Sequence, residues 1–224
     1  SAFAPENTLA AVRAALAPLG DASDPQGAGR GGADGVEFDV RLAADGTPVV
    51  FHDDTTEALT GVPGTIEERT LDQIRGLRVR GEPIPTLAEV LAEFARLRPT
   101  ARPATLNVEL KPTGHSRPLI DACAPLLEPY SRGPEASLVV SSFDPRVLMA
   151  ALDADVSWRL ALIYEDLYAL TALPTLEART ATLDLHPSRE LLDSAHLSAY
   201  GRPGRAFRVW TVDDPAEAAQ LCAL

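Results

Sequence analysis

Three acidic residues of this chain stand inside short apolar runs that are typical of strands: Glu37, Asp39 and Glu109. Successive side chains of a strand point to opposite faces, so Glu37 and Asp39 share one face. Two carboxylates on one face of a buried strand are costly unless a positive charge compensates them. Hard divalent cations prefer oxygen ligands, and this spacing therefore indicates a cation site.

A histidine follows this acidic pair closely. The turn signal 44–47 and the extended run Pro48–His52 come directly after the first strand-like run. This separation is too short for a crossover helix, so we expect a hairpin whose antiparallel pairing returns His52 close to Asp39. An imidazole that titrates near neutral pH can donate or accept a proton there.

Structural roles compete with these chemical ones. Glu37 and Asp39 could pair with Arg41 or other basic side chains in a purely structural network, and Glu109 could form an ion pair with Lys111 on its own strand. Both alternatives stay open at this point. The other histidines lack matched partners, and we expect them in loops or at the surface: His115, His186 and His196.

Length and composition bound the class of protein. The chain has 224 residues and 46% hydrophobic content, which fits one globular domain of the larger kind. Its net charge of −12 disfavours sequence-independent nucleic-acid binding. No apolar run has the length of a membrane span, so we expect no stable membrane insertion. Cys123 and Cys222 lack metal-type spacing, and we expect a cytoplasmic protein.

Strand-like and helix-like segments alternate along the chain, which indicates an α/β fold with a parallel sheet. A doubly wound sheet is the rival, but no Gly-rich dinucleotide-type turn follows any strand. Six strand–helix units predict most of an eight-fold (β/α)8 TIM barrel. The expected barrel strands lie at 36–40, 106–111, 137–142, 156–164, 182–186 and 206–212. The expected helices lie at about 7–17, 70–77, 117–127, 167–173 and 188–195, the last capped by Ser188. Three others begin at Leu87, after a Thr86–Glu89 capping box, and at Pro145 and Pro215, each after an aspartate cap, Asp144 and Asp214.

Several short segments carry a family pattern in their order and spacing: Pro5–Thr8, Glu37–Val40, Asp45–Asp53, Glu109–Lys111, Ser141–Phe143 and Val209–Val212. Together they resemble the glycerophosphodiester phosphodiesterase family over nearly the whole chain. The resemblance implies a TIM barrel of the phosphatidylinositol-phospholipase-C-like kind. It also implies hydrolysis of glycerophosphodiesters to glycerol 3-phosphate and an alcohol, with a divalent cation, Ca²⁺ or Mg²⁺.

By this resemblance, Glu37, Asp39 and Glu109 are the metal ligands. His52 is one of two catalytic histidines, and Lys111 lies where the family places a basic residue near the phosphate. We expect three further substrate contacts, although each has a structural alternative: Glu6, Phe143 and Trp210.

Two other functions remain as alternatives. One is a lysophospholipase D-like or other phosphodiesterase on the same scaffold. The other is a non-catalytic barrel that binds phosphate esters. In each case the expected partner is a small molecule, and the sequence assigns no oligomeric state.

The resemblance also creates an expectation about the ends of the chain. Family members begin with a strand that ends in His-Arg-Gly, which carries the second histidine, and close with a further strand. Here the chain opens at Ser1 and stops at Leu224. We therefore expect a single barrel domain over residues 1–224 that lacks both strands and is weakly active or inactive as it stands. The loop Gly20–Gly32 receives no function.

Overall fold

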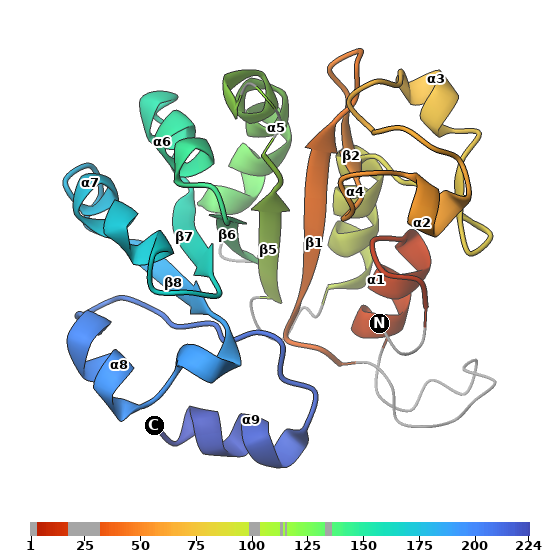
Figure 1. Cartoon of the computed structure of the whole chain (residues 1–224). Coiled ribbons are helices and arrows are strands. Elements are labelled where there is room, and N and C mark those ends of the chain that lie inside the picture. Colours follow the sequence, from red (N-terminus) through yellow and green to blue (C-terminus); the bar gives the residue numbers. More distant parts are fainter. Residues whose placement is uncertain (1–3, 18–31, 99–103, 113, 115, 133–135) are drawn as a thin grey trace.

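The computed structural model describes residues 4–17, 32–98, 104–112, 114, 116–132 and 136–224 (Figure 1). Within them a six-stranded sheet has the order β2-β1-β5-β6-β7-β8. Strand β2 pairs antiparallel with β1, whereas β1, β5, β6, β7 and β8 are parallel. The strands are β1 (Gly35–Leu42), β2 (Pro48–Val50), β5 (Ala104–Leu110), β6 (Ala136–Ser142), β7 (Arg159–Tyr164) and β8 (Leu183–Pro187).

Helices connect the parallel strands and cover one face of the sheet, as Figure 1 shows for α5 and α6. A separate two-stranded sheet, β3 (Arg78–Val79) and β4 (Glu82–Pro83), lies in the excursion between β2 and α4. The helices are α1 (Leu9–Leu16), α2 (Glu57–Thr60), α3 (Leu71–Ile74), α4 (Leu87–Leu97), α5 (Ser116–Ser131), α6 (Pro145–Asp153), α7 (Leu173–Glu177), α8 (Ser194–Tyr200) and α9 (Pro215–Cys222). No helix of the described ranges is both long and apolar enough to cross a bilayer.

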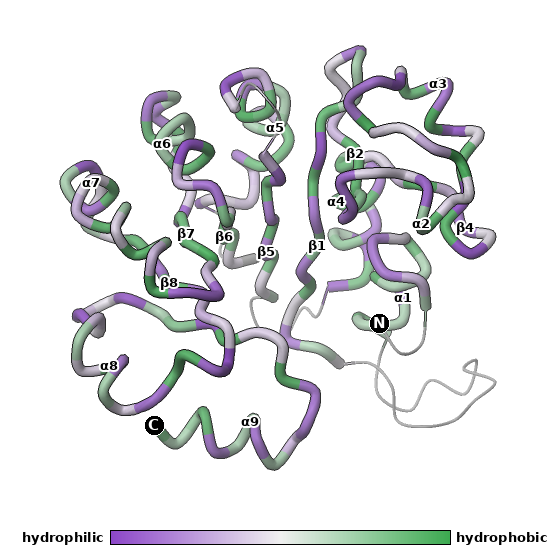
Figure 2. The backbone as a smooth tube through the Cα atoms, in the orientation of Figure 1, coloured by the Kyte–Doolittle hydropathy of each residue, from purple (hydrophilic) through white to green (hydrophobic). Residues whose placement is uncertain are grey.

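Strand alternation divides the sheet into an apolar and a polar face. One face packs its side chains against the helices in the main core: Phe38, Val40, Leu106, Val108, Leu138, Val140, Leu160, Leu162, Leu183 and Leu185. The residues between them point to the other face, and these include Glu37, Asp39 and Glu109. Green and purple alternate along β1 in Figure 2 for this reason. The predicted α/β fold with a parallel sheet is confirmed.

The sixth predicted strand, 206–212, is not a continuous strand. It pairs in parallel with β8 through isolated bridges, Leu185 with Phe207 and Ser188 with Trp210. The Trp210 main-chain N–H donates to the Pro187 carbonyl at 3.2 Å. Among the described residues the sheet therefore ends in a bridged segment and does not close into a barrel.

Most predicted helix caps are present, but one helix begins elsewhere. The prediction of a helix over 188–195 capped by Ser188 is wrong. A 3₁₀ turn covers Arg189–Leu191, and α8 begins after Asp193, whose carboxylate accepts from the His196 main-chain N–H at 2.7 Å. Similarly, the predicted helix 167–173 is a 3₁₀ turn, Ala169–Ala172, that continues into α7. Competing local hydrogen bonds of Asp and Ser side chains decide such starts.

A buried carboxylate joins the bridged segment to the sheet. Asp184 is 0% exposed and accepts hydrogen bonds from Arg159 Nε at 2.6 Å, Arg208 Nη1 at 2.6 Å and the Ala206 main-chain N–H at 2.8 Å. Burial by itself would raise the pKa of Asp184, but these hydrogen bonds together lower it below its usual range. The charged carboxylate thus ties β7, β8 and the segment after Gly204 together.

We expect Asp184→Asn to lower the free energy of unfolding by about 3 kcal/mol, because it leaves two arginines facing an uncharged partner. The lowered pKa means that the wild type gains this stability above the normal Asp range, near pH 4, and loses it as the pH falls below that. Urea denaturation at pH 7 and pH 3 measures both effects. As a control, Asp121→Asn removes an exposed i,i+4 partner of Arg117 and should cost under about 1 kcal/mol. Equal losses for the two variants would contradict the role of Asp184.

Candidate functional site

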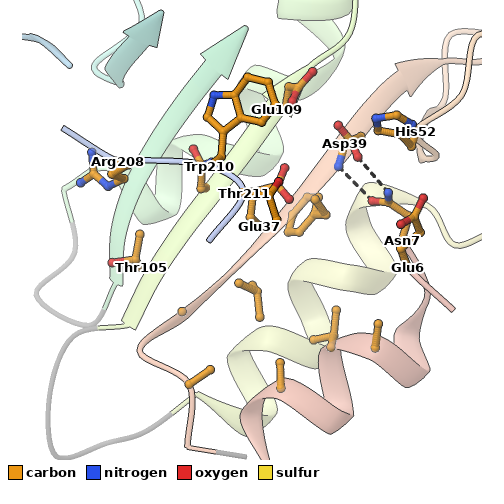
Figure 3. A pocket seen from close by; sticks show the side chains of 18 of the residues that line it. Glu6, Asn7, Glu37, Asp39, His52, Thr105, Glu109, Arg208, Trp210 and Thr211 are labelled. Carbon is orange, nitrogen blue, oxygen red and sulfur yellow. Dashed lines mark hydrogen bonds between the residues drawn. The ribbon is translucent and has the colours of Figure 1, made fainter. Parts of the chain in front are cut away.

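Three carboxylates converge on the polar face of the sheet. Strand β1 supplies Glu37 and Asp39, and the neighbouring β5 supplies Glu109, which lies opposite Asp39 in the parallel register. One carboxylate oxygen from each lies within 4.8 Å of the others. Figure 3 shows them on adjacent strands of one cavity. The sequence prediction that these side chains share one place is confirmed in its geometry.

The cluster carries more negative charge than its surroundings compensate. Burial and the nearby Asp39 and Glu109 raise the pKa of Glu37 to about 8, and burial with Asp39 also raises the pKa of Glu109. Although many protein atoms surround the Glu37 carboxyl, the residue is exposed to solvent through the cavity. Lys111 Nζ lies 2.9 Å from Asp39 Oδ1 and 2.5 Å from Glu109 Oε1.

The donor set fits a divalent cation. The ligand atoms are all carboxylate oxygens, which hard cations prefer. Buried Glu109 Oε1 accepts no well-directed hydrogen bond from the described residues, although Lys111 Nζ is close. One lysine offsets only part of the charge of three carboxylates, and this charge adds to the effect of burial in raising the pKa of Glu37. A cation with two positive charges would remove this imbalance.

The two structural alternatives have different outcomes. Arg41 does not pair with the acidic cluster: its guanidinium contacts Asp54 at 2.5 Å and Glu67 at 3.1 Å. The ion pair between Glu109 and Lys111 does form, and it extends to Asp39. Lys111 therefore belongs to the cluster as its partial counter-charge.

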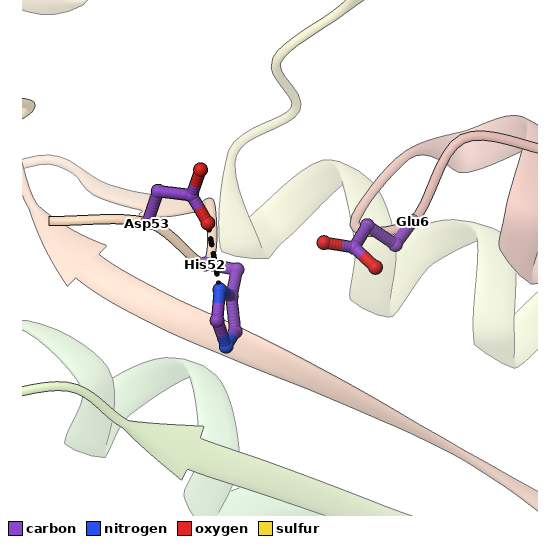
Figure 4. Close-up of side chains that lie close together, drawn as sticks. All are labelled: Glu6, His52 and Asp53. Carbon is purple, nitrogen blue, oxygen red and sulfur yellow. Dashed lines mark hydrogen bonds and ion pairs between the residues drawn. The ribbon is translucent and has the colours of Figure 1, made fainter. Parts of the chain in front are cut away.

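His52 lies at the edge of this cluster because the hairpin returns it there. Arg41 Nη2 donates to the His52 carbonyl at 3.0 Å, and the Phe51 main-chain N–H donates to the Asp39 carbonyl at 3.0 Å. The ring atom Nδ1 lies 2.8 Å from Asp53 Oδ1. Figure 4 shows the imidazole beside Asp53, with Glu6 on the facing loop. A ligand atom of Glu6 lies within 4.8 Å of those of His52 and Asp53.

Asn7 is a site residue that our reading of the sequence did not single out. Its Nδ2 donates to Asp39 Oδ2 at 2.8 Å, and the Asp39 main-chain N–H donates to its Oδ1 at 3.0 Å (Figure 3). Its backbone is left-handed, with φ 57°, which asparagine tolerates better than most residues. The Pro5–Thr8 segment, which is part of the family pattern, contains this residue. Its contact with Asp39 could not be read from that segment, because the two residues lie 32 positions apart in the chain.

An aromatic pair forms part of the cavity wall. The rings of Phe143 and Trp210 meet edge to face, with centroids 5.3 Å apart, and Lys111 Nζ lies 5.9 Å from the Phe143 centroid. Trp210 Nε1 donates to the His186 carbonyl at 2.8 Å, which holds the indole against β8. All predicted site residues line this one cavity of about 1190 Å³: Glu6, Glu37, Asp39, His52, Glu109, Lys111, Phe143 and Trp210. Their roles remain predictions.

Two histidines contradict the expectation of surface positions. His186 points to the polar face of β8 and lines the cavity, and burial lowers its pKa to about 3. His196 is buried beside Tyr164, whose hydroxyl lies 2.7 Å from its Nε2. The expectation failed because burial of a histidine follows from tertiary packing, which short-range pattern does not report. His115 lies outside the described residues.

Comparison with known proteins agrees with this geometry. A family model described as the glycerophosphoryl diester phosphodiesterase family matches residues 1–224. The chain belongs to this family. Bovine glycerophosphodiester phosphodiesterase 1 is 34% identical over 173 residues, which cover 72% of the chain and 45% of the relative. The chain thus spans less than half of that relative's length.

Family members of more similar length are also found. A glycerophosphodiester phosphodiesterase of Caldanaerobacter subterraneus is 28% identical over 222 residues, covering 93% of the chain and 81% of the relative. Among solved structures, an Oleispira antarctica phosphodiesterase in complex with the product sn-glycerol-3-phosphate matches with a TM-score of 0.80 and 26% identity. The match covers 100% of this chain and 85% of the Oleispira antarctica chain.

Removal of the Asn7 side chain tests its support of Asp39. Asn7→Gly deletes both hydrogen bonds and keeps the left-handed backbone accessible. We expect the affinity for Ca²⁺ or Mg²⁺, measured by calorimetry, to fall about 10- to 100-fold, as for other residues that orient a ligand. Asp155→Gly is the matched control, since Asp155 is exposed and also left-handed, with φ 53°. An unchanged affinity in Asn7→Gly would remove Asn7 from the site.

Proposed function

We propose that this protein hydrolyses glycerophosphodiesters to glycerol 3-phosphate and an alcohol. One observation carries the proposal: Glu37, Asp39 and Glu109 bring carboxylate oxygens within 4.8 Å of one another in the cavity that His52 and Lys111 also line. Family membership supports it, as do the relatives named as glycerophosphodiester phosphodiesterases.

Glu37, Asp39 and Glu109 would hold the divalent cation, Ca²⁺ or Mg²⁺. Such an ion neutralises the diester anion and stabilises charge that develops on the phosphoryl oxygens. Lys111 offsets part of the carboxylate charge and adds a positive point charge for the phosphate. Asn7 keeps Asp39 in place through two hydrogen bonds.

His52 is the proposed acid/base group. When Nδ1–H donates to Asp53 Oδ1, the opposite ring atom, Nε2, is left to exchange a proton. In the neutral ring Nε2 can take a proton from the attacking hydroxyl, and in the charged ring it can give a proton to the departing alkoxide. Arg41 holds the main chain of His52, so the ring sits at a defined point of the cavity edge.

Three cavity residues complete the proposed substrate contacts. Phe143 and Trp210 form an aromatic wall beside Lys111, which suits the carbon atoms of a bound ester. Glu6 lies at the exposed edge next to His52, where it can contact the polar part of the substrate.

Cation dependence is the first test. We expect EDTA to abolish hydrolysis of glycerophosphocholine and added Ca²⁺ or Mg²⁺ to restore it. Added cation should also raise the melting temperature of the wild type, because it binds only the folded chain. Glu109→Gln should lose both effects. Turnover that survives EDTA would contradict the proposed chemistry, whereas turnover of lysophosphatidylcholine alone would favour the lysophospholipase D-like alternative.

His52→Asn separates proton transfer from cation binding. We expect kcat for glycerophosphocholine to fall about 10²- to 10⁴-fold, the usual contribution of a general acid or base. The cation should still raise the melting temperature of this variant, because all three carboxylates remain. A variant with wild-type kcat would show that His52 transfers no proton. Full cation binding without hydrolysis in the wild type would favour the non-catalytic phosphate-ester-binding alternative.

A further inference from the structure

His186 is a buried histidine of the cavity wall that the proposed chemistry does not use. His186 is only 3% exposed, and its Nε2 has no hydrogen-bond partner among the described residues. Buried polar atoms in folded proteins nearly always have a partner, since an unpaired one loses its hydration without compensation. An unpaired nitrogen in a cavity wall therefore points to a bound molecule.

The position of His186 places it on the substrate side of the sheet. In β8, Leu183 and Leu185 pack into the helix-covered core, so Asp184 and His186 point to the polar face. The register pairs Ala161 with Asp184 and Ile163 with His186, which lies one level nearer the carboxyl end. His186 lines the same cavity as Glu37, His52 and Lys111.

This part of the wall is held rigidly. The His186 carbonyl accepts a hydrogen bond from Trp210 Nε1 at 2.8 Å, and Arg208 Nη1 donates one to the Asp184 carboxylate at 2.6 Å. In Figure 3, Trp210 and Arg208 lie across the cavity from His52 and Asp39. A molecule that reaches from the acidic cluster to Trp210 would thus meet the neighbourhood of His186.

The charge state of His186 decides what it can bind. Burial, reinforced by the nearby Arg208, lowers its pKa to about 3, so the imidazole is neutral at physiological pH. A neutral imidazole offers one N–H donor and one lone-pair acceptor. Anionic groups such as phosphate are best matched by charged donors, whereas a hydroxyl group is itself one donor and one acceptor.

We propose that His186 is a specificity-determining residue that exchanges a hydrogen bond with a free hydroxyl of the substrate's glycerol part. The inference rests on the proposed function, because it assigns one contact within that substrate. Hydroxyl groups on the departing alcohol have the same chemistry, so the experiment must separate the two sources. A site with a buried polar group strongly disfavours an analogue that leaves this group unpaired.

The test compares diesters with and without free hydroxyls on the glycerol part. Glycerophosphocholine carries free hydroxyls on glycerol alone, propyl phosphocholine keeps the same departing alcohol but lacks these hydroxyls, and bis(4-nitrophenyl) phosphate has a hydroxyl on neither side. We expect His186→Leu to lower kcat/KM for glycerophosphocholine about 10- to 100-fold and to change that for the other two less than about 3-fold. His186→Asn keeps a donor and an acceptor, and should recover part of the loss.

His196→Asn is the matched control, since this buried histidine does not line the cavity. It should cost stability and leave the ratio of the kcat/KM values unchanged. Equal proportional losses on all diesters in His186→Leu would overturn the inference. A loss on propyl phosphocholine as large as that on glycerophosphocholine would overturn the assignment to glycerol.

Failure of the proposed function would look different. In that case the wild type hydrolyses no diester, and calorimetry decides the role of His186 instead. With Ca²⁺ present, His186→Leu should weaken binding of sn-glycerol 3-phosphate about 10-fold or more and leave binding of inorganic phosphate unchanged. Equal effects on both ligands would overturn the inference, as would no effect on either.

Discussion

Mutual repulsion of three carboxylates is the constraint around which the polar face of this protein is organised. Parallel pairing of β1 with β5 places Asp39 opposite Glu109, and alternation places Glu37 on the same face. The sheet cannot separate these charges without losing its register. Neighbouring groups must therefore compensate them, and burial together with the charges of Asp39 and Glu109 raises the pKa of Glu37 despite the nearby Lys111.

The surrounding residues make sense as responses to that constraint. Lys111 supplies a positive charge from the same strand as Glu109, and Asn7 orients Asp39 from the loop before α1. The hairpin brings His52 to the edge of the cluster, where Asp53 holds its Nδ1. Arg41, which could have neutralised the cluster, instead fixes the end of the hairpin. Within the described ranges Lys111 is thus the basic side chain that pairs with these carboxylates.

The opposite part of the polar face has a different electrostatic character. Asp184 binds two arginines, Arg159 and Arg208, and burial, reinforced by Arg208, lowers the pKa of His186 so that its imidazole is neutral. A single cavity therefore runs from an acidic cluster to a weakly basic, aromatic wall. Such an asymmetric cavity can orient a molecule whose two ends differ in charge and hydrogen-bonding capacity.

Local pattern was sufficient for much of the fold and for the cluster itself. The strand periods, the Thr86–Glu89 capping box and the Asp144 and Asp214 caps were readable because each depends on residues a few positions apart. It was insufficient where distant segments compete. The start of α8 moved to Asp193, and the 206–212 segment forms only bridges with β8.

The amino-acid sequence by itself determined which side chains share a strand face, because strand geometry fixes the alternation of side chains. It thereby determined that Glu37 and Asp39 lie together and that His52 returns toward them. Only the tertiary structure decided which distant groups complete the site. The contacts of Asn7 with Asp39, of Arg41 with Asp54, and of His186 with the cavity depend on how separate segments pack, and no short-range pattern records that packing.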